Sequence, residues 1–257
     1  MNTKISILIL TSFVLFSCEK EIELDVNSSE SQHVIEALLP FDSYASVSIV
    51  KSKNYNQDHQ YPPVPSATVT LSDNTGNSEV LEFMPSGLYE SRIIKGIQGV
   101  TYFLTIEIGE KIYTSLSTMP YAVQIEDLSM FHLQLMGSFP IIRFNDPPGI
   151  ENYYRAILYI NGKRMPDMAV MDDEDTDGKM NSSFIPFDSQ YNNGNDIAKG
   201  DIVFVEMQCL DKGAYTYFET LRRINMSLTN PTSNITGGAL GYFSTYISSS
   251  KEIIADW

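Results

Sequence analysis

The stretch "DDEDTDGKM", residues 172–180, carries the side chains that most resemble a set of metal ligands in this chain. From Asp173 onward it reads D-x-D-x-D-G, which is the first half of an EF-hand calcium loop. A complete loop takes oxygen ligands at positions 1, 3 and 5, a glycine at position 6 and a bidentate glutamate at position 12. Position 12 here is Phe184, which has no oxygen to offer. We therefore predict no metal site, and three aspartates remain as weak candidate ligands: Asp173, Asp175 and Asp177.

The sequence around the acidic stretch favours a turn over a metal loop. The helices that flank an EF-hand are missing, because Asn161-Gly162 signals a β-hairpin before the stretch and "SSFIPF" after it reads as extended. Asp177-Gly178 supplies turn geometry without any metal, and the neighbouring carboxylates repel one another when no ion is present. We expect a solvated, open turn whose response to calcium is weak and confined to millimolar concentrations.

Other patterns that support catalysis are absent from the sequence. The three histidines, His33, His59 and His132, are far apart, and none lies in an H-E-x-x-H motif. The chain has no G-x-S-x-G nucleophile motif and no glycine loop that follows a strand and opens a helix around a phosphate. We predict that the protein is not an enzyme and has no cofactor. A hydrolase assembled from residues distant in sequence is the least favoured alternative.

The N-terminal segment has the features of a lipoprotein signal. Lys4 is the only charge before an apolar run from Ile5 to Phe16, which is too short for a membrane anchor and suits a signal-peptide core. The run ends in "LFSC", in which a small residue precedes Cys18. We predict a signal peptide over residues 1–17 and acylation of Cys18, which would attach the protein to membrane lipid. The alternative is an ordinary secretory signal with an incidental cysteine.

The residues after Cys18 predict a flexible tether over residues 18–27. The tether begins with "EKEIE", and acidic residues behind a lipidated cysteine resemble the signal that sends Bacteroidota lipoproteins to the outer face of the outer membrane. A solvated, disordered tether explains the same composition, and the two readings are compatible. We therefore expect a lipid-anchored outer-membrane protein that faces the cell exterior.

Cysteine content and charge limit the possible partners. The chain has two cysteines, and acylation of Cys18 would leave Cys209 without a disulfide partner. Cys209 alternates with apolar residues in "DIVFVEMQCL", so we expect it to be buried and unreactive. The formal net charge of −15 repels nucleic acid and anionic lipid headgroups, so neither is an expected partner.

The first half of the chain predicts an antiparallel β-sandwich over residues 28–122, of an Ig-like or prealbumin-like kind. In "QHVIEALL", "ASVSIVK" and "SATVTLSDNTGN" apolar and polar residues alternate with the period of a half-buried strand, and turn residues separate the strands. A proline-rich loop, residues 52–66, interrupts this pattern. We interpret it as a surface crossover in preference to a functional loop.

Residues 123–257 predict a β-rich domain with one packed helix. Its strands include "NYYRAILYI", followed by the Asn161-Gly162 turn and a return strand that Pro166 would confine to a sheet edge. A helix is predicted at about 212–228, with Asp211 as its N-cap and an apolar stripe facing the sheet. The fold class is therefore mostly β, with two domains.

Several stretches, in order, resemble a known family: "CEKEIELD", "PPVPSATVTLSDNTG", "SGLYES", "TYFLTIE", "FNDPPG" followed by "NYYRA", and "NPTSNITGGALGYFS". The last is the most specific, because several glycines and an aromatic residue fall in a fixed frame. The chain is similar over its whole mature length to uncharacterised Bacteroidota outer-membrane lipoproteins that share a numbered domain of unknown function (the four-two-four-nine family).

The resemblance implies a function that the residues alone do not. Members of that family look like companions of TonB-dependent receptors, so the expected function is a non-enzymatic accessory or binding subunit in nutrient uptake. The alternative is a structural or adhesive surface protein that mediates protein contacts. The family has no established catalytic residues that could be transferred to this chain.

Overall fold

The fold was analysed in a computed structural model that describes residues 31–257, except 53–60, 135–136 and 225–228. The predicted signal peptide (residues 1–17), Cys18, the tether (residues 18–27) and His59 lie outside the described residues. The described part is mostly β, with one α-helix and one short 3₁₀ helix, η1 (Ser189–Asn192), which confirms the predicted fold class. Neither of these helices is long and apolar enough to cross a membrane.

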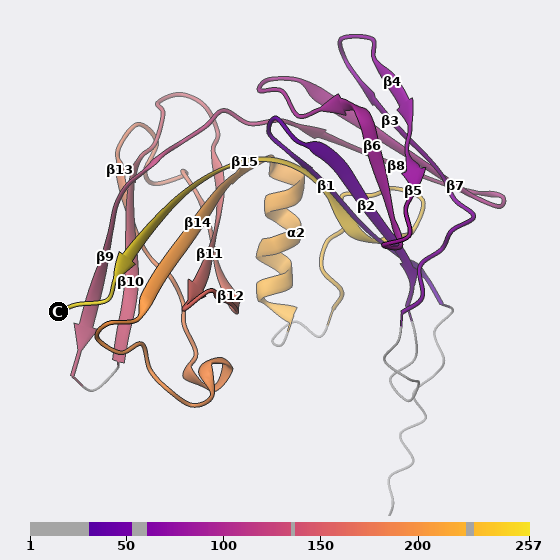
Figure 1. Ribbon diagram of the computed structural model, residues 1–257. Helices are drawn as coiled ribbons and strands as arrows, with labels where there is room; N and C mark the ends of the chain where they lie inside the picture. The colour runs from indigo at the N-terminus through magenta and orange to yellow at the C-terminus, as the bar shows by residue number, and fades with distance from the viewer. Residues whose placement is uncertain (1–30, 53–60, 135–136, 225–228) are drawn as a thin grey trace, which may run out of the picture. The chain divides into compact units, whose positions relative to one another are not determined.

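The largest element is an eight-stranded sheet built from both halves of the sequence (Figure 1). Neighbouring strands are antiparallel except for β1 and β15, which run parallel. In spatial order the strands are β12 (Lys163–Asp172), β11 (Tyr153–Ile160), β14 (Ile202–Leu210), β15 (Leu240–Ile254), β1 (His33–Pro40), β2 (Tyr44–Lys51), β6 (Leu88–Lys95) and β5 (Glu82–Phe83).

Two smaller sheets pack on one face of the large sheet. Phe243 of β15 lies in the core beneath the first of them, and Ile247 lies in the core beneath the second. These two residues are four apart in one strand, so their side chains point to the same side. The first sheet is β4 (Ser78–Val80), β3 (Thr68–Asp73), β7 (Thr101–Ile108) and β8 (Lys111–Thr118); the second is β13 (Met180–Phe184), β10 (Gly137–Asn145) and β9 (Ile125–Leu133).

The α-helix of the described part, α2 (Lys212–Arg222), packs on the opposite face of the large sheet (Figure 1). The rings of Tyr217 and Phe218 lie 4.6 and 4.8 Å from that of Tyr242 in β15. The Asp211 carboxylate accepts a hydrogen bond from the N–H of Ala214, which confirms the predicted N-cap. Helix α2 spans Lys212–Arg222, and residues 225–228, at the end of the predicted range, lie outside the described part.

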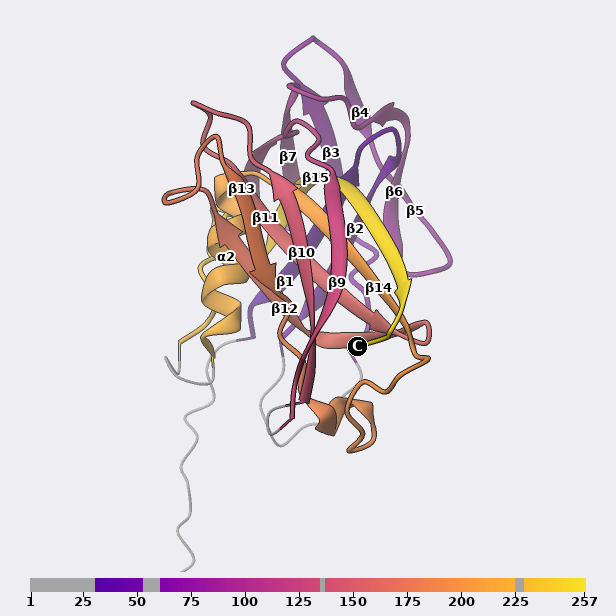
Figure 2. The same cartoon turned by 90° about the vertical axis from the view of Figure 1, so that its left-hand side faces the viewer.

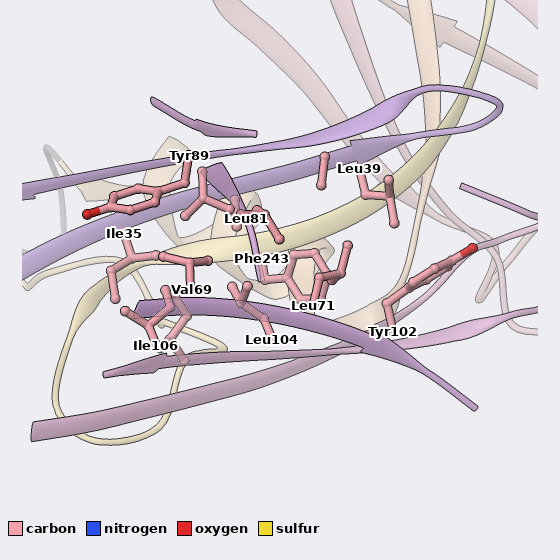
Figure 3. Close-up of a cluster of buried hydrophobic side chains, with 14 of the residues drawn as sticks. Ile35, Leu39, Val69, Leu71, Leu81, Tyr89, Tyr102, Leu104, Ile106 and Phe243 are labelled. Carbon is pink, nitrogen blue, oxygen red and sulfur yellow. The ribbon is translucent and has the colours of Figure 1, made fainter. Parts of the chain in front are cut away.

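The core beneath the first small sheet follows the alternation seen in the sequence (Figure 3). Ile35 and Leu39 of β1 face Val69 and Leu71 of β3, and all four side chains are fully buried. Alternate residues of a strand point to opposite faces, so each strand contributes every second side chain to this core. The alternation predicted over these strands is therefore confirmed.

The two cores share strand β15. The predicted domain boundary at residue 122 falls between β8 and β9, yet Phe243 and Ile235 from beyond it lie in the first core. A strand of fifteen residues is long enough to pair with β14 at its C-terminal end and with β1 at its N-terminal end. Residues 31–257 accordingly form one compact unit, in which a continuous sheet joins the two cores beneath the small sheets and a third apolar cluster beneath α2.

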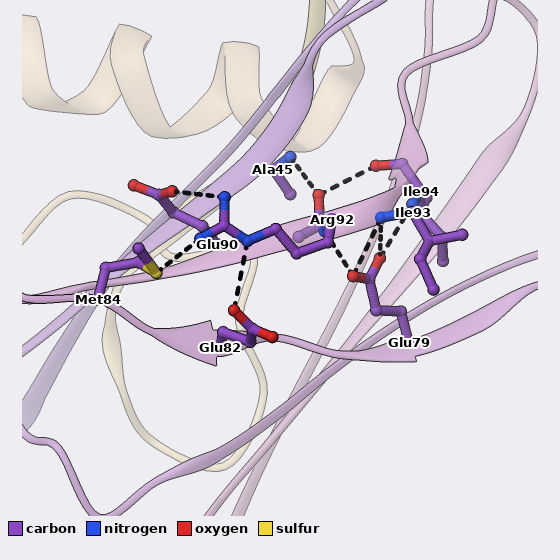
Figure 4. Close-up of polar contacts among 9 residues, drawn as sticks. Ala45, Glu79, Glu82, Met84, Glu90, Arg92, Ile93 and Ile94 are labelled. Atoms are coloured by element: carbon purple, nitrogen blue, oxygen red, sulfur yellow. Dashed lines mark hydrogen bonds and ion pairs between the residues drawn. The ribbon is translucent and has the colours of Figure 1, made fainter.

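One end of the large sheet is tied to the edge of the first small sheet by Glu79 (Figure 4). Its carboxylate, carried by edge strand β4, accepts hydrogen bonds from the backbone N–H groups of three successive residues in β6: Arg92 at 2.5 Å, Ile93 at 3.0 Å and Ile94 at 2.9 Å. These three residues lie where the pairing of β6 with β2 shifts register, and neither β2 nor β5 pairs with them. We call this contact the Glu79 bridge.

Candidate functional site

The acidic loop between β12 and β13 packs against the loop between β10 and β11. The N–H of Gly149 donates to the Asp177 carboxylate at 2.6 Å, and the N–H of Asn152 donates to Asp173 at 2.9 Å. The two loops meet because β10 pairs with β13. This pairing places the start of the loop after β10 beside the end of the acidic loop before β13. The "FNDPPG" and "DGK" stretches are thus joined in space.

Three carboxylates gather where these loops meet. One oxygen of each of Asp146, Asp173 and Asp177 lies within 4.8 Å of the others, and the first two residues are buried. The structure therefore brings together two of the three candidate ligands and adds Asp146, which we did not single out from the sequence. Asp175 lies outside this group; its carbonyl oxygen accepts a hydrogen bond from the Lys179 ammonium at 3.2 Å.

The hydrogen-bond partners of Asp146 show how the cluster is held. One oxygen accepts from the Tyr154 hydroxyl at 2.5 Å and the other from the N–H of Gly178 at 3.3 Å. Burial raises the pKa of Asp146, these hydrogen bonds oppose the rise, and the charges of Asp173 and Asp177 add to it. None of the ion pairs between described residues includes these three carboxylates.

The chemistry open to this cluster is to hold a proton or a cation. Either would reduce the repulsion between carboxylates that are close together and partly out of water. Three carboxylates supply few of the six to eight oxygens that calcium takes, so backbone oxygens and water would have to complete the shell. The loop is not the fully solvated turn that we expected, because Asp173 is buried and bonded to Asn152. That it binds no metal stays a prediction.

The described histidines do not meet. His33 in β1 contacts the Tyr113 hydroxyl at 2.8 Å, and His132 in β9 contacts the Ser138 hydroxyl at 3.0 Å. They belong to different sheets, and each is bonded to a different hydroxyl. Cys209 is buried, and burial raises the pKa of its thiol to about 11. The thiol therefore stays protonated near neutral pH, in keeping with the expected buried residue.

A second feature, not singled out from the sequence, is an apolar groove of about 660 Å³ beside the edge strands β12 and β13. We call it the open-edge groove. The meeting of β9 and β10 with β12 depends on the tertiary fold. The lining residues are Phe131, Leu133, Phe139, Met168, Ala169, Val170, Met171, Ser182, Ser183, Phe184, Ile185, Pro186 and Arg222.

Comparison with known proteins identifies the family. The family model described as "Domain of unknown function (DUF4249)" matches residues 19–252, which is nearly the whole chain. A search among curated proteins found no match. The matched region contains both small sheets, the acidic loop, the open-edge groove and all of the eight-stranded sheet except the last two residues of β15. The chain therefore belongs to the DUF4249 family, as its motifs suggested.

Proposed function

We propose that the protein is a lipid-anchored, surface-exposed lipoprotein of the outer membrane that acts as a non-enzymatic binding subunit of a TonB-dependent receptor in nutrient uptake. The observation that carries the proposal is the combination of family membership over residues 19–252 with the "LFSC" sequence that ends at Cys18. The acidic "EKEIE" tether supports display on the outer face.

The described residues support a binding role more than a catalytic one. A hydrolytic site brings a nucleophile or an activated water together with an acid or base. In the described chain, the histidines lie apart, Cys209 is buried and the grouped carboxylates are held by backbone N–H groups. The open-edge groove, by contrast, offers an apolar surface of the size that small-molecule sites have, roughly 300–1,000 Å³.

Co-purification from the outer membrane tests the receptor proposal. The full chain, carrying an affinity tag at its C-terminus, would be extracted from its native outer membrane in mild detergent, captured and resolved by mass spectrometry. We expect a TonB-dependent receptor in a near-stoichiometric amount, and loss of that receptor when the tagged chain is Cys18→Ala. Capture of the wild-type chain without any receptor would contradict the proposal and favour the structural or adhesive alternative.

The anchor and the topology are tested separately. Cys18→Ala should abolish labelling by an alkyne fatty-acid probe and release the protein from the membrane fraction, whereas Cys209→Ala should do neither. Protease added to intact cells should digest the wild-type chain. Labelling of the Cys18→Ala chain would overturn the anchor, and complete protection until the outer membrane is opened would place the protein on the periplasmic face.

A further inference from the structure

The open-edge groove has an aromatic wall on the outer face of the three-stranded sheet. Phe131 of β9 lies directly opposite Phe139 of β10, and the Phe184 ring of β13 lies 5.5 Å from that of Phe131. These side chains face away from the core beneath the sheet, which holds Leu128 and Ile142. Phe131 and Phe184 are 40% and 56% exposed, so the wall keeps much of its apolar surface in contact with water.

The facing wall comes from β12 and from the end of α2. Met168 and Met171 of β12 contribute flexible apolar side chains, which adapt to ligands of varied shape. Arg222, the last residue of α2, is the one ionisable residue among the described residues of the lining. Figure 2 shows β13 on the side of the three-stranded sheet nearest to α2, consistent with its place beside Arg222 in the lining.

The end of α2 brings positive charge to the groove, although the chain as a whole is strongly acidic. Arg222 and Arg223 share one carboxylate, that of Glu219, at 3.6 and 2.5 Å, so the three residues together carry a net charge of +1. Half of the Arg222 side chain is exposed, which leaves donors of its guanidinium accessible to a ligand. The remaining polar side chains in the lining are the hydroxyls of Ser182 and Ser183.

The edge strands themselves are poor templates for an added strand. β13 has only five residues, and β12 contains Pro166 and a register shift where it pairs with β11. Short edges, prolines and bulges are the features that block edge-to-edge pairing. A polypeptide strand is therefore a less favoured occupant than a small molecule that contacts side chains.

We propose that the open-edge groove binds a single-chain amphipathic anion, whose apolar body lies on the aromatic wall and whose carboxylate or sulfonate pairs with Arg222. This proposal names a ligand class for the binding subunit proposed above. It rests on that proposed function only for the expectation that the ligand is a nutrient. Binding to the purified chain does not require the receptor, so failure of this test and failure of co-purification are separate results.

The test is calorimetric titration of the full chain in lipid nanodiscs with sodium decanoate, and in parallel with the neutral decan-1-ol. An empty-nanodisc titration corrects for partition into lipid, and that partition is the same for every variant. We expect saturable decanoate binding that Arg222→Ala weakens about tenfold, because a charge-assisted hydrogen bond is lost. The same variant should change decan-1-ol binding less than about twofold. Phe184→Ser should weaken both ligands, because both use the aromatic wall.

Arg143→Ala is the matched control. Arg143 lies in the same three-stranded sheet, is exposed to a similar extent and pairs with Asp127 outside the groove. It should leave decanoate binding unchanged, and circular dichroism should show that every variant is folded. The proposal is overturned if decanoate does not saturate the folded wild-type chain, if Arg222→Ala binds decanoate as the wild type does, or if Arg143→Ala weakens binding equally.

Discussion

The two ends of the eight-stranded sheet differ in how the edge of the large sheet is joined to the small sheet beside it. At each end, the edge of the large sheet lies beside the edge of a smaller sheet packed on it. Near β5 and β6, the Glu79 bridge joins the two sheets by hydrogen bonds to three backbone N–H groups. At β12 and β13 the groove remains, lined by apolar side chains and Arg222.

The difference shows how one fold can provide both rigidity and a binding surface. A carboxylate that accepts hydrogen bonds from successive backbone N–H groups fixes the distance between two sheets. An apolar surface left in water gains free energy when a ligand covers it, at about 25 cal/mol per Å² buried. We therefore expect substitutions at the first end to change stability and substitutions at the second end to change binding.

The largest effect is expected in the strand that joins the two ends. Phe243 of β15 is 1% exposed, and Phe243→Ala should lower the free energy of unfolding by about 3–5 kcal/mol. Because β15 belongs to both halves, tryptophan fluorescence and far-ultraviolet circular dichroism should still report one common transition in denaturant. Ile254→Ala, in the same strand but 70% exposed, should cost less than about 0.5 kcal/mol. Two separated transitions would indicate that the halves fold independently.

Removal of the Glu79 bridge is expected to have the next largest effect. Glu79→Ala leaves three backbone donors without their acceptor, which should lower the free energy of unfolding by about 1–3 kcal/mol in urea denaturation. The control is Glu82→Ala, because the Glu82 carboxylate is exposed and pairs only with the side chain of Arg92. Equal losses in the two variants would mean that the bridge contributes nothing beyond surface charge.

Calcium is expected to have a smaller effect, at the acidic loop of the second end. Five millimolar calcium should raise the free energy of unfolding by less than about 1 kcal/mol, because a site with few protein ligands binds in the millimolar range. Thermal unfolding with and without calcium, against sodium chloride of matched ionic strength, is the measurement. A large rise that Asp177→Asn removes and Asp175→Asn retains would show that the three-carboxylate cluster is a calcium site.

The smallest effect is expected from pH. The pKa of Asp146 is raised by burial and by Asp173 and Asp177, so the folded state holds the proton more tightly than the unfolded state does. The resulting stabilisation is complete below the usual aspartate pKa and is lost as the pH rises through the folded pKa. Asp177→Asn should flatten this part of the profile of stability against pH, whereas Asp175→Asn should leave it unchanged. Identical profiles of stability against pH for the wild type and both variants would show that the charge of Asp177 does not raise the pKa of Asp146.

Local patterns in the sequence predicted the local structure well. The Asn161-Gly162 turn joins β11 to β12 with positive φ at both residues, and β12 is an edge strand, as Pro166 indicated. The Asp211 N-cap and the alternation in β1 and β3 are also confirmed. Each of these features depends on residues close together in the chain.

Contacts between distant segments were not predictable in the same way. The parallel pairing of β1 with β15 joins residues more than two hundred positions apart, and no turn signal specifies it. Asp146 joins the acidic cluster only because β10 pairs with β13. Arg222 was read as part of a core-packed helix, and its position at the groove depends on how α2 lies on the sheet. Both candidate sites therefore required the tertiary structure.

The central claim, that one end of the sheet is closed and the other is open to a ligand, is tested most directly by hydrogen–deuterium exchange. The full chain in nanodiscs would be labelled with and without saturating decanoate and analysed by mass spectrometry. The account predicts added protection in peptides covering β12, β13 and the end of α2, and no change in peptides covering β4 to β6. Protection at β4 to β6, or none at β12 and β13, would contradict it.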